Sequence, residues 1–105
     1  MILQGVGASL GKVRARCVDQ DAYQKSLEDH PVILVADFIP PTVTSLKKAV
    51  VGIVTEDGGL LSHAACIARE FGIPCVVGVE DAVRVLNGKE IEINGLEGTV
   101  YAEGY

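Results

Sequence analysis

A histidine that follows a glycine pair is the part of this sequence whose residue types and spacing could do chemistry. His63 comes shortly after Gly58-Gly59, and Ser62, directly before it, is a residue type that caps helices. Histidine forms covalent intermediates as a nucleophile and is partly deprotonated near neutral pH. The first turn of a helix favours an anion, because its amides lack partners within the helix and the helix dipole is positive there. We therefore expect that His63 could carry a phosphoryl group.

The residues around His63 could support that group. Gly58 and Gly59 permit positive φ angles and leave the ring accessible. The Ser62 hydroxyl and the amides after it could bond phosphoryl oxygens. Thr55 could hydrogen-bond the histidine or a phosphate, although it fits equally well as an ordinary strand end. The alternative for His63 itself is an ordinary first-turn residue, with the glycines serving the turn alone.

Other kinds of site are disfavoured by the sequence. A P-loop would need a Lys after the glycines, and a serine hydrolase would need a Gly-x-Ser-x-Gly elbow. The cysteines are odd in number and have no zinc-ligand spacing, so we expect plain buried thiols and no metal site: Cys17, Cys66 and Cys75. His30 lies in a polar stretch and is expected on the surface.

The elements that must position His63 can be predicted from apolar patterning. The β-branched runs Val32 to Ala36 and Val50 to Thr55 predict buried strands. Small apolar residues at helical spacing predict a helix that Ser62 caps and Gly72 ends. Pro40-Pro41-Thr42 predicts a turn and then a short helix through about Ala49, capped by Thr42 or Thr44.

The remaining segments complete a mixed α/β domain of about six or seven strands and three helices. Residues 19 to 30 are expected to be a surface loop that can include one helical turn, and residues 80 to 86 a short helix in preference to a hairpin arm. Further strands are expected around Gly5 to Gly11, Val13 to Cys17, Cys75 to Val79, Lys89 to Ile93 and Thr99 to Ala102.

Size and charge narrow the class of protein. A chain of 105 residues with 49% hydrophobic residues can form one core, so we expect a single domain over residues 1–105. The formal net charge of -5 disfavours binding to nucleic acid. No apolar run is long enough for a membrane span and the start lacks the order of a signal peptide, so the cytoplasm is the expected location.

Nearly the whole sequence resembles a known family. The similar runs are Gly5 to Gly11, Val32 to Pro41, Ile53 to Gly59, Ser62 to Ala65, Ala68 to Gly78 and Leu86 to Val100. They resemble the mobile phosphohistidine domain of phosphoenolpyruvate-utilising enzymes, such as phosphoenolpyruvate synthase, pyruvate phosphate dikinase and enzyme I of the sugar phosphotransferase system. The resemblance implies an α/β fold of the swivelling β/β/α type, with mixed sheets packed with short helices.

The same resemblance implies a phosphoryl carrier. His63 aligns with the phosphorylated histidine, Gly58, Gly59 and Ser62 with the loop around it, and Thr55 with the strand that leads in. The group would come from phosphoenolpyruvate or ATP through partners in separate chains or a larger parent enzyme: a nucleotide-binding domain and a phosphoenolpyruvate/pyruvate-binding barrel. No cofactor is expected in this domain, with Mg²⁺ in the partner's active site.

One pair of residues departs from the family. Leu60-Leu61 stand where the family often has Arg or Met followed by Thr or Cys, so the hydroxyl used for regulatory phosphorylation in plant-type dikinases is missing.

The sequence lacks a carboxylate cluster that could hold Mg²⁺ and a phosphoryl donor. We therefore expect a phosphotransferase component that does not turn over without partners. The alternative is a non-catalytic swivelling regulatory or docking module, like the extra C-terminal domain of some pyruvate kinases. A small metal- or metabolite-binding protein is a weaker third possibility. The glycine pair with Ser-His favours the carrier, because a docking module could lose its histidine without losing its fold.

Overall fold

The chain forms one mixed sheet flanked by short helices in a computed structural model, which describes residues 1–25 and 30–102. The eight strands follow the order β1-β8-β7-β3-β4-β5-β6-β2. The strands are β1 (Ile2–Gln4), β2 (Val6–Ser9), β3 (Lys12–Asp19), β4 (Val32–Ala36), β5 (Val50–Thr55), β6 (Cys75–Val77), β7 (Glu90–Asn94) and β8 (Thr99–Ala102). The helices are α1 (Gln20–Lys25), α2 (His63–Phe71) and α3 (Ala82–Leu86). The predicted α/β class is confirmed.

The parallel part of the sheet brings two loops together. Strands β3, β4, β5 and β6 are parallel neighbours, so their carboxyl ends share one edge. Residues 37–49, here the 37–49 loop, follow β4, and residues 56–62, the 56–62 loop, follow β5. The Asp57 amide donates to the Asp37 carbonyl at 2.8 Å, which holds the starts of the two loops side by side.

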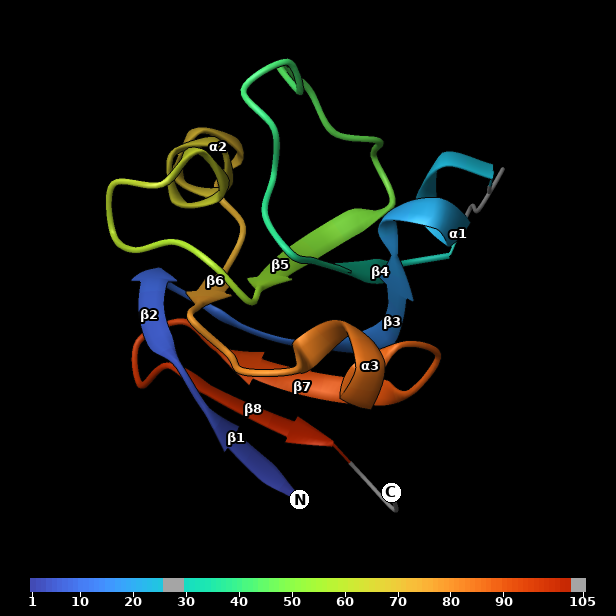
Figure 1. The fold of residues 1–105 in the computed structure, drawn as a ribbon, viewed down its shortest axis with the longest axis vertical. Helices are drawn as coiled ribbons and strands as arrows, with labels where there is room; N and C mark the ends of the chain where they lie inside the picture. The colour runs from blue at the N-terminus through green and yellow to red at the C-terminus, as the bar shows by residue number, and fades with distance from the viewer. Residues whose placement is uncertain (26–29, 103–105) are drawn as a thin grey trace.

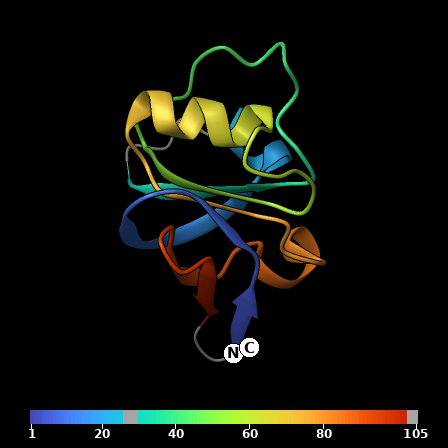
Figure 2. The ribbon, with the colours of Figure 1, turned by 90° about the vertical axis from the view of Figure 1, so that its left-hand side faces the viewer.

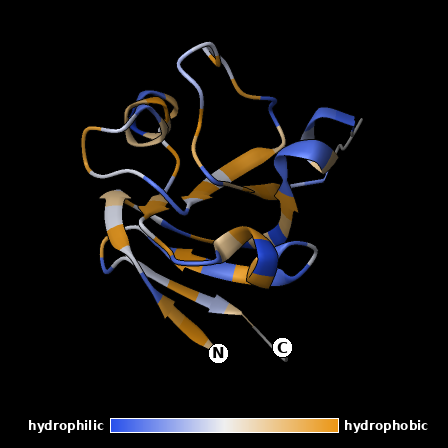
Figure 3. Ribbon diagram, in the orientation of Figure 1, coloured by the Kyte–Doolittle hydropathy of each residue, from blue (hydrophilic) through white to orange (hydrophobic). Residues whose placement is uncertain are grey.

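The sheet folds over on itself and α2 covers one of its faces (Figures 1 and 2). Strand β4 is buried on both sides and is therefore apolar throughout, as Figure 3 shows. Its Leu34 packs in the cluster under α2, with Ala64 and Ile67. Its Ile33 faces the other way, into a second cluster that includes Val100 of β8. These layers are the β/β/α arrangement that the resemblance implied.

The predicted helix over residues 42–49 is wrong. The 37–49 loop has turns but no helix, and the Val43 amide donates to the Pro40 carbonyl at 3.0 Å. Three consecutive β-branched residues, 42–44, lose side-chain freedom in a helix. The loop is instead fixed by contacts outside itself: the Lys47 amide donates to the Tyr23 hydroxyl of α1 at 3.0 Å.

The other expectations differ from the structure in smaller ways. The segment expected as a surface loop with a helical turn forms the six-residue helix α1, and its residues 26–29 lie outside the described part. Strand β6 ends at Val77 because Gly78 turns the chain with a φ of 71°. Helix α3 confirms the prediction for residues 80–86. Across residues 1–25 and 30–102, no helix has the length and apolarity to cross a membrane.

Candidate functional site

Local signals place His63 at the first position of α2, as predicted. Ser62 has an extended backbone, and its Oγ accepts a hydrogen bond from the Ala65 amide at 3.3 Å. At the other end, Gly72 takes the left-handed conformation with a φ of 68°. The apolar face of the helix, which includes Ala64 and Ile67, is buried against the sheet. Burial of this face fixes how α2 presents its first turn.

The imidazole lies between the two loops. The ring is half-buried, and its Nε2 is 2.6 Å from the carbonyl oxygen of Val43 in the 37–49 loop. A carbonyl oxygen only accepts, so Nε2 carries a proton, and in the neutral ring the lone pair is on Nδ1. The sequence did not point to Val43, since a backbone carbonyl leaves no signal in the side-chain pattern.

Hydrogen bonds and a glycine shape the 56–62 loop. Thr55 is fully buried, and its hydroxyl donates to the Asp57 carbonyl at 2.7 Å, so it braces the loop and makes no hydrogen bond with the ring. Gly58 has a φ of 111°, and a Cβ there would lie 2.9 Å from the Cβ of Ser62. A Cβ on Gly59 would meet nothing within 4 Å. The backbone therefore requires glycine at position 58, whereas position 59 is merely open.

Arg69 fastens this loop from the last turn of α2. One guanidinium nitrogen, Nη2, donates to the Leu60 carbonyl at 2.6 Å, and Nη1 donates to the Ala8 carbonyl of β2 at 2.8 Å. The sequence gave no partner for Arg69. Its two acceptors are backbone carbonyls remote in sequence, which patterning does not reveal.

The thiols divide into two kinds. Burial raises the pKa of Cys17 to about 12, and nearby Asp19 adds to that rise. Burial also raises the pKa of Cys75 to about 12, although Arg69 acts in the opposite direction. Cys66 is exposed on α2, so the expectation that all three thiols are buried is wrong for this one. Position 66 lies on the solvent side of α2, between residues whose side chains face the sheet.

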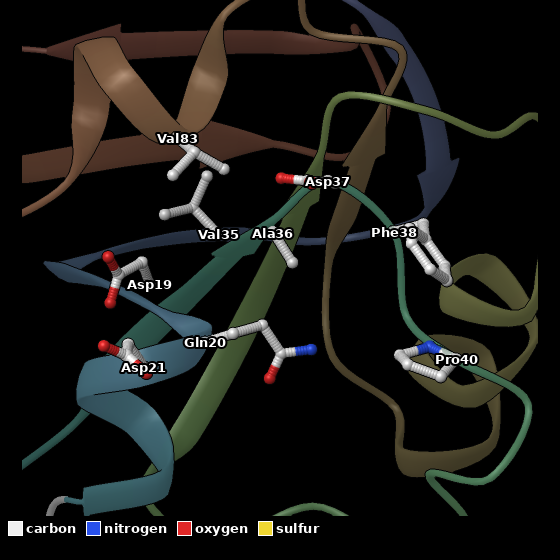
Figure 4. A pocket seen from close by; sticks show the side chains of 9 residues that line it. All are labelled: Asp19, Gln20, Asp21, Val35, Ala36, Asp37, Phe38, Pro40 and Val83. Atoms are coloured by element: carbon white, nitrogen blue, oxygen red, sulfur yellow. The ribbon is translucent and has the colours of Figure 1, made fainter.

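A hollow of about 340 Å³ lies at the carboxyl ends of β3 and β4, but it is separate from the histidine. Figure 4 shows Asp19, Asp21 and Asp37 around it. Asp19 accepts hydrogen bonds from the Ala22 amide and from Asn87, and Asp21 pairs with Lys25. Among the described residues, no group of three or more His, Cys, Asp or Glu is placed to hold a metal ion.

The arrangement at His63 suits a charged group on the ring. The amides of His63 and Ala64 are at the first two positions of α2 and have no acceptor within the helix. The Ser62 hydroxyl uses an oxygen lone pair as the cap and keeps its proton for another acceptor. An anion at the ring would meet the positive end of the helix dipole.

Known proteins are similar to this chain over most of its length. The sequence is 44% identical over 100 residues to rifampicin phosphotransferase of Streptomyces sviceus, covering 93% of this chain and 11% of that protein. It is 40% identical over 105 residues to phosphoenolpyruvate synthase of Pyrococcus furiosus, covering 96% and 13%. The chain therefore spans little more than a tenth of the length of these curated relatives.

A solved structure and a family pattern agree with these relatives. The solution structure of an enzyme I protein superposes with a TM-score of 0.63 at 35% identity, covering 76% of this chain and 34% of that one. Residues 28–98, which include both loops and α2, match the family described as PEP-utilising enzyme, mobile domain. This chain belongs to the mobile-domain family of phosphoenolpyruvate-utilising enzymes.

Proposed function

We propose that this chain is a phosphoryl carrier in which His63 accepts a phosphoryl group and passes it on. The observation that carries the proposal is the position of the imidazole at the first residue of α2, beside the Ser62 cap and the tight turn at Gly58. The relatives supply the class of chemistry, since one is called a phosphotransferase and another a phosphoenolpyruvate synthase.

The transfer step needs a lone pair on the ring. We propose that Nε2 is the nucleophile, which requires the ring proton to be on Nδ1 and the Val43 carbonyl to move away from Nε2. The Nε2 lone pair then attacks phosphorus, an N–P bond forms, and the P–O bond breaks with its electron pair on the leaving oxygen of the donor. The group leaves by the reverse chemistry, with an acceptor oxygen as the attacking atom.

The donor belongs to a partner. We propose that phosphoenolpyruvate or ATP binds to a nucleotide-binding domain or a phosphoenolpyruvate/pyruvate barrel outside residues 1–105, with Mg²⁺ there. The support is that the described residues offer no cluster suited to a divalent ion. Strands β1 and β8 pair at the end of the molecule far from α2, so polypeptide beyond either would leave the histidine face clear (Figures 1 and 2). We also propose a cytoplasmic location, where free thiols are the rule.

The proposal is tested by loading the histidine. The chain is incubated with phosphoenolpyruvate or ATP, Mg²⁺ and lysate of its source, and intact mass is measured. We expect a gain of one phosphoryl group that is labile in acid and stable in base, which His63→Ala abolishes. His30→Ala, at the chain's other histidine, is the matched control and retains the gain.

Two results would contradict the carrier. A phosphoryl gain that persists in His63→Ala would move the modification to another residue. A wild-type chain that gains nothing from either donor would favour the regulatory or docking module, in which the fold and histidine are retained without transfer.

A further inference from the structure

We propose that Leu61 is the apolar anchor through which the partner protein that loads His63 holds this chain. The inference rests on the proposed function, and it adds the surface and the kind of partner that the carrier needs. The anchor belongs to a docking surface that we define as the exposed apolar side chains of the two loops beside the histidine: Phe38, Leu60 and Leu61.

Among the described residues, Leu61 is the most exposed of the large apolar side chains. Leu61 is 91% exposed, and Leu60 and Phe38 are 52% and 54% exposed. They come from both loops, whose starts are joined by the Asp57–Asp37 hydrogen bond. Large apolar side chains that gather on the surface of a folded protein mark a binding site more often than scattered ones do.

The loop backbone holds Leu61 in this exposed position. The Leu60 carbonyl accepts from Arg69, and the Ser62 amide donates to the Gly59 carbonyl at 3.1 Å. The backbone on both sides of Leu61 is therefore hydrogen-bonded, so docking costs this segment little further conformational freedom. A contact that is already ordered contributes more net binding energy than one that must first be ordered.

Phosphoryl transfer to His63 requires the partner to cover Leu61 as well. Transfer requires the donor phosphorus to lie about 3–3.5 Å from the ring nitrogen, with water excluded. One residue, Ser62, separates Leu61 from His63, the first residue of α2. A protein surface that delivers phosphorus to the ring therefore also covers this leucine, and an apolar wall in the partner would remove it from water.

The charge of the surface also matches a phosphoryl-donor site. Asp57 is exposed at the start of the 56–62 loop, and the exposed Asp37 bonded to its amide borders the separate hollow. A site that binds phosphoenolpyruvate or a nucleotide is cationic, because it must neutralise the phosphates. The two lysines of the 37–49 loop are at its other end, where Lys47 bonds Tyr23. Arg69 is the cation beside Leu60, and its guanidinium is bonded to two backbone carbonyls. The occupant is therefore a protein with an apolar wall beside a cationic donor site. A second copy of this chain would bring the same acidic residues together.

The test separates docking from the reactivity of the ring. Phosphoramidate is a small phosphoryl donor that needs no docking surface. We measure the initial rate of phosphohistidine formation at low chain concentration with source lysate, Mg²⁺ and the active donor, and divide it by the rate with phosphoramidate alone. We expect Leu61→Ser to lower this ratio about 10-fold or more, from the loss of one buried leucine.

Two variants control for size and surface apolarity. Leu61→Met keeps an apolar side chain and should restore most of the ratio. Leu10→Ser removes a leucine that is 71% exposed and lines a hollow with Gly72, at the opposite end of α2. It should leave the ratio unchanged.

The remaining outcomes distinguish failure of the anchor alone from failure of the carrier, on which the anchor rests. An unchanged ratio in Leu61→Ser, or an equal fall in Leu10→Ser, would remove the anchor while the carrier stands. The same holds for a wild-type dimer that Leu61→Ser dissociates, because a second copy would then occupy the surface. A wild-type chain loaded by phosphoramidate but not by lysate with either donor would overturn the carrier itself.

Discussion

The two loops beside His63 are held in different ways, although they follow neighbouring parallel strands. The 56–62 loop is shaped by bonds near it in sequence, from Thr55 to Asp57 and from Ala65 to the Ser62 cap, and Arg69 of α2 adds one remote fastening. The 37–49 loop is fixed by distant partners, since Val43 meets His63 and Lys47 meets Tyr23. The histidine therefore lies between a loop shaped mostly by nearby residues and a loop positioned by contacts remote in sequence.

This difference indicates where the site can open. Movement of the part of the 37–49 loop around Val43 frees Nε2 from the Val43 carbonyl, while Ile39 stays in the core. Movement of the 56–62 loop would disturb Gly58, the Ser62 cap and the bond from Arg69 to the Leu60 carbonyl together. We expect the ring to become available on the Val43 side, while the helix and its amides stay in place to receive the anion.

The largest change in stability is expected from a substitution at Gly58 in the 56–62 loop. Gly58→Ala forces a side chain into a positive-φ position and against Ser62, so the free energy of unfolding should fall by about 1–3 kcal/mol. Gly59→Ala is the matched control, because its Cβ meets open space, and should change stability by less than about 0.5 kcal/mol. Urea denaturation measures both. Equal losses would show that the loop does not have the conformation described.

A smaller loss is expected when the remote fastening of that loop is removed. Arg69→Met deletes the bonds to the Leu60 and Ala8 carbonyls and should cost about 1–2 kcal/mol. Arg84→Met is the control: its guanidinium pairs with Asp81 on the surface, so a change below about 0.5 kcal/mol is expected. If Arg69→Met left the free energy of unfolding unchanged, local bonds alone would hold the 56–62 loop.

The 37–49 loop gives a still smaller effect on global stability. Tyr23→Phe removes the acceptor of the Lys47 amide and should cost about 0.5–1 kcal/mol. Amide hydrogen exchange should accelerate in residues 37–49 and stay unchanged in 56–62. Tyr101→Phe, at a side chain that is 42% exposed on β8, should alter neither loop. Faster exchange in both loops would contradict their separate anchoring.

Alkylation of the accessible thiol near neutral pH should change stability least. Iodoacetamide at pH 8 should modify Cys66 and spare Cys17 and Cys75, as measured by peptide mass spectrometry, with little change in stability. Alkylation of either buried thiol in the native protein would contradict the packing of the strands that hold them.

The pH dependence of stability follows from the same two buried thiols. Their folded-state pKa of about 12 exceeds the ordinary value of 9.0, so the unfolded chain releases these protons first. The stabilising contribution of the two thiols is therefore fully present below pH 9. It is lost as the pH rises toward 12, by up to about 1.4 kcal/mol per pH unit for each thiol. Denaturation at pH 8 and pH 10 checks the sign. A chain that is equally stable at both would contradict the raised pKa values.

Much of the fold was predictable where the local pattern and the tertiary environment agree. Strands β4 and β5 are apolar on both faces because a helix layer and a second sheet layer cover them. Helix α2 begins and ends where Ser62 and Gly72 predict. The helix expected over residues 42–49 failed because proline and hydroxyl signals at its start did not outweigh β-branched residues and contacts made elsewhere.

The sequence alone determined the histidine, its helix and the glycine turn, because capping, chain reversal and amphipathic burial depend on residues a few positions apart. Only the tertiary structure decided what faces the ring and what fastens the turn. The Val43 carbonyl and the carbonyls that Arg69 binds are backbone groups, present at every residue, and a side-chain pattern cannot single them out. Their positions follow from the parallel pairing of β4 with β5 and from the packing of α2 on the sheet, which bring together residues far apart in the chain.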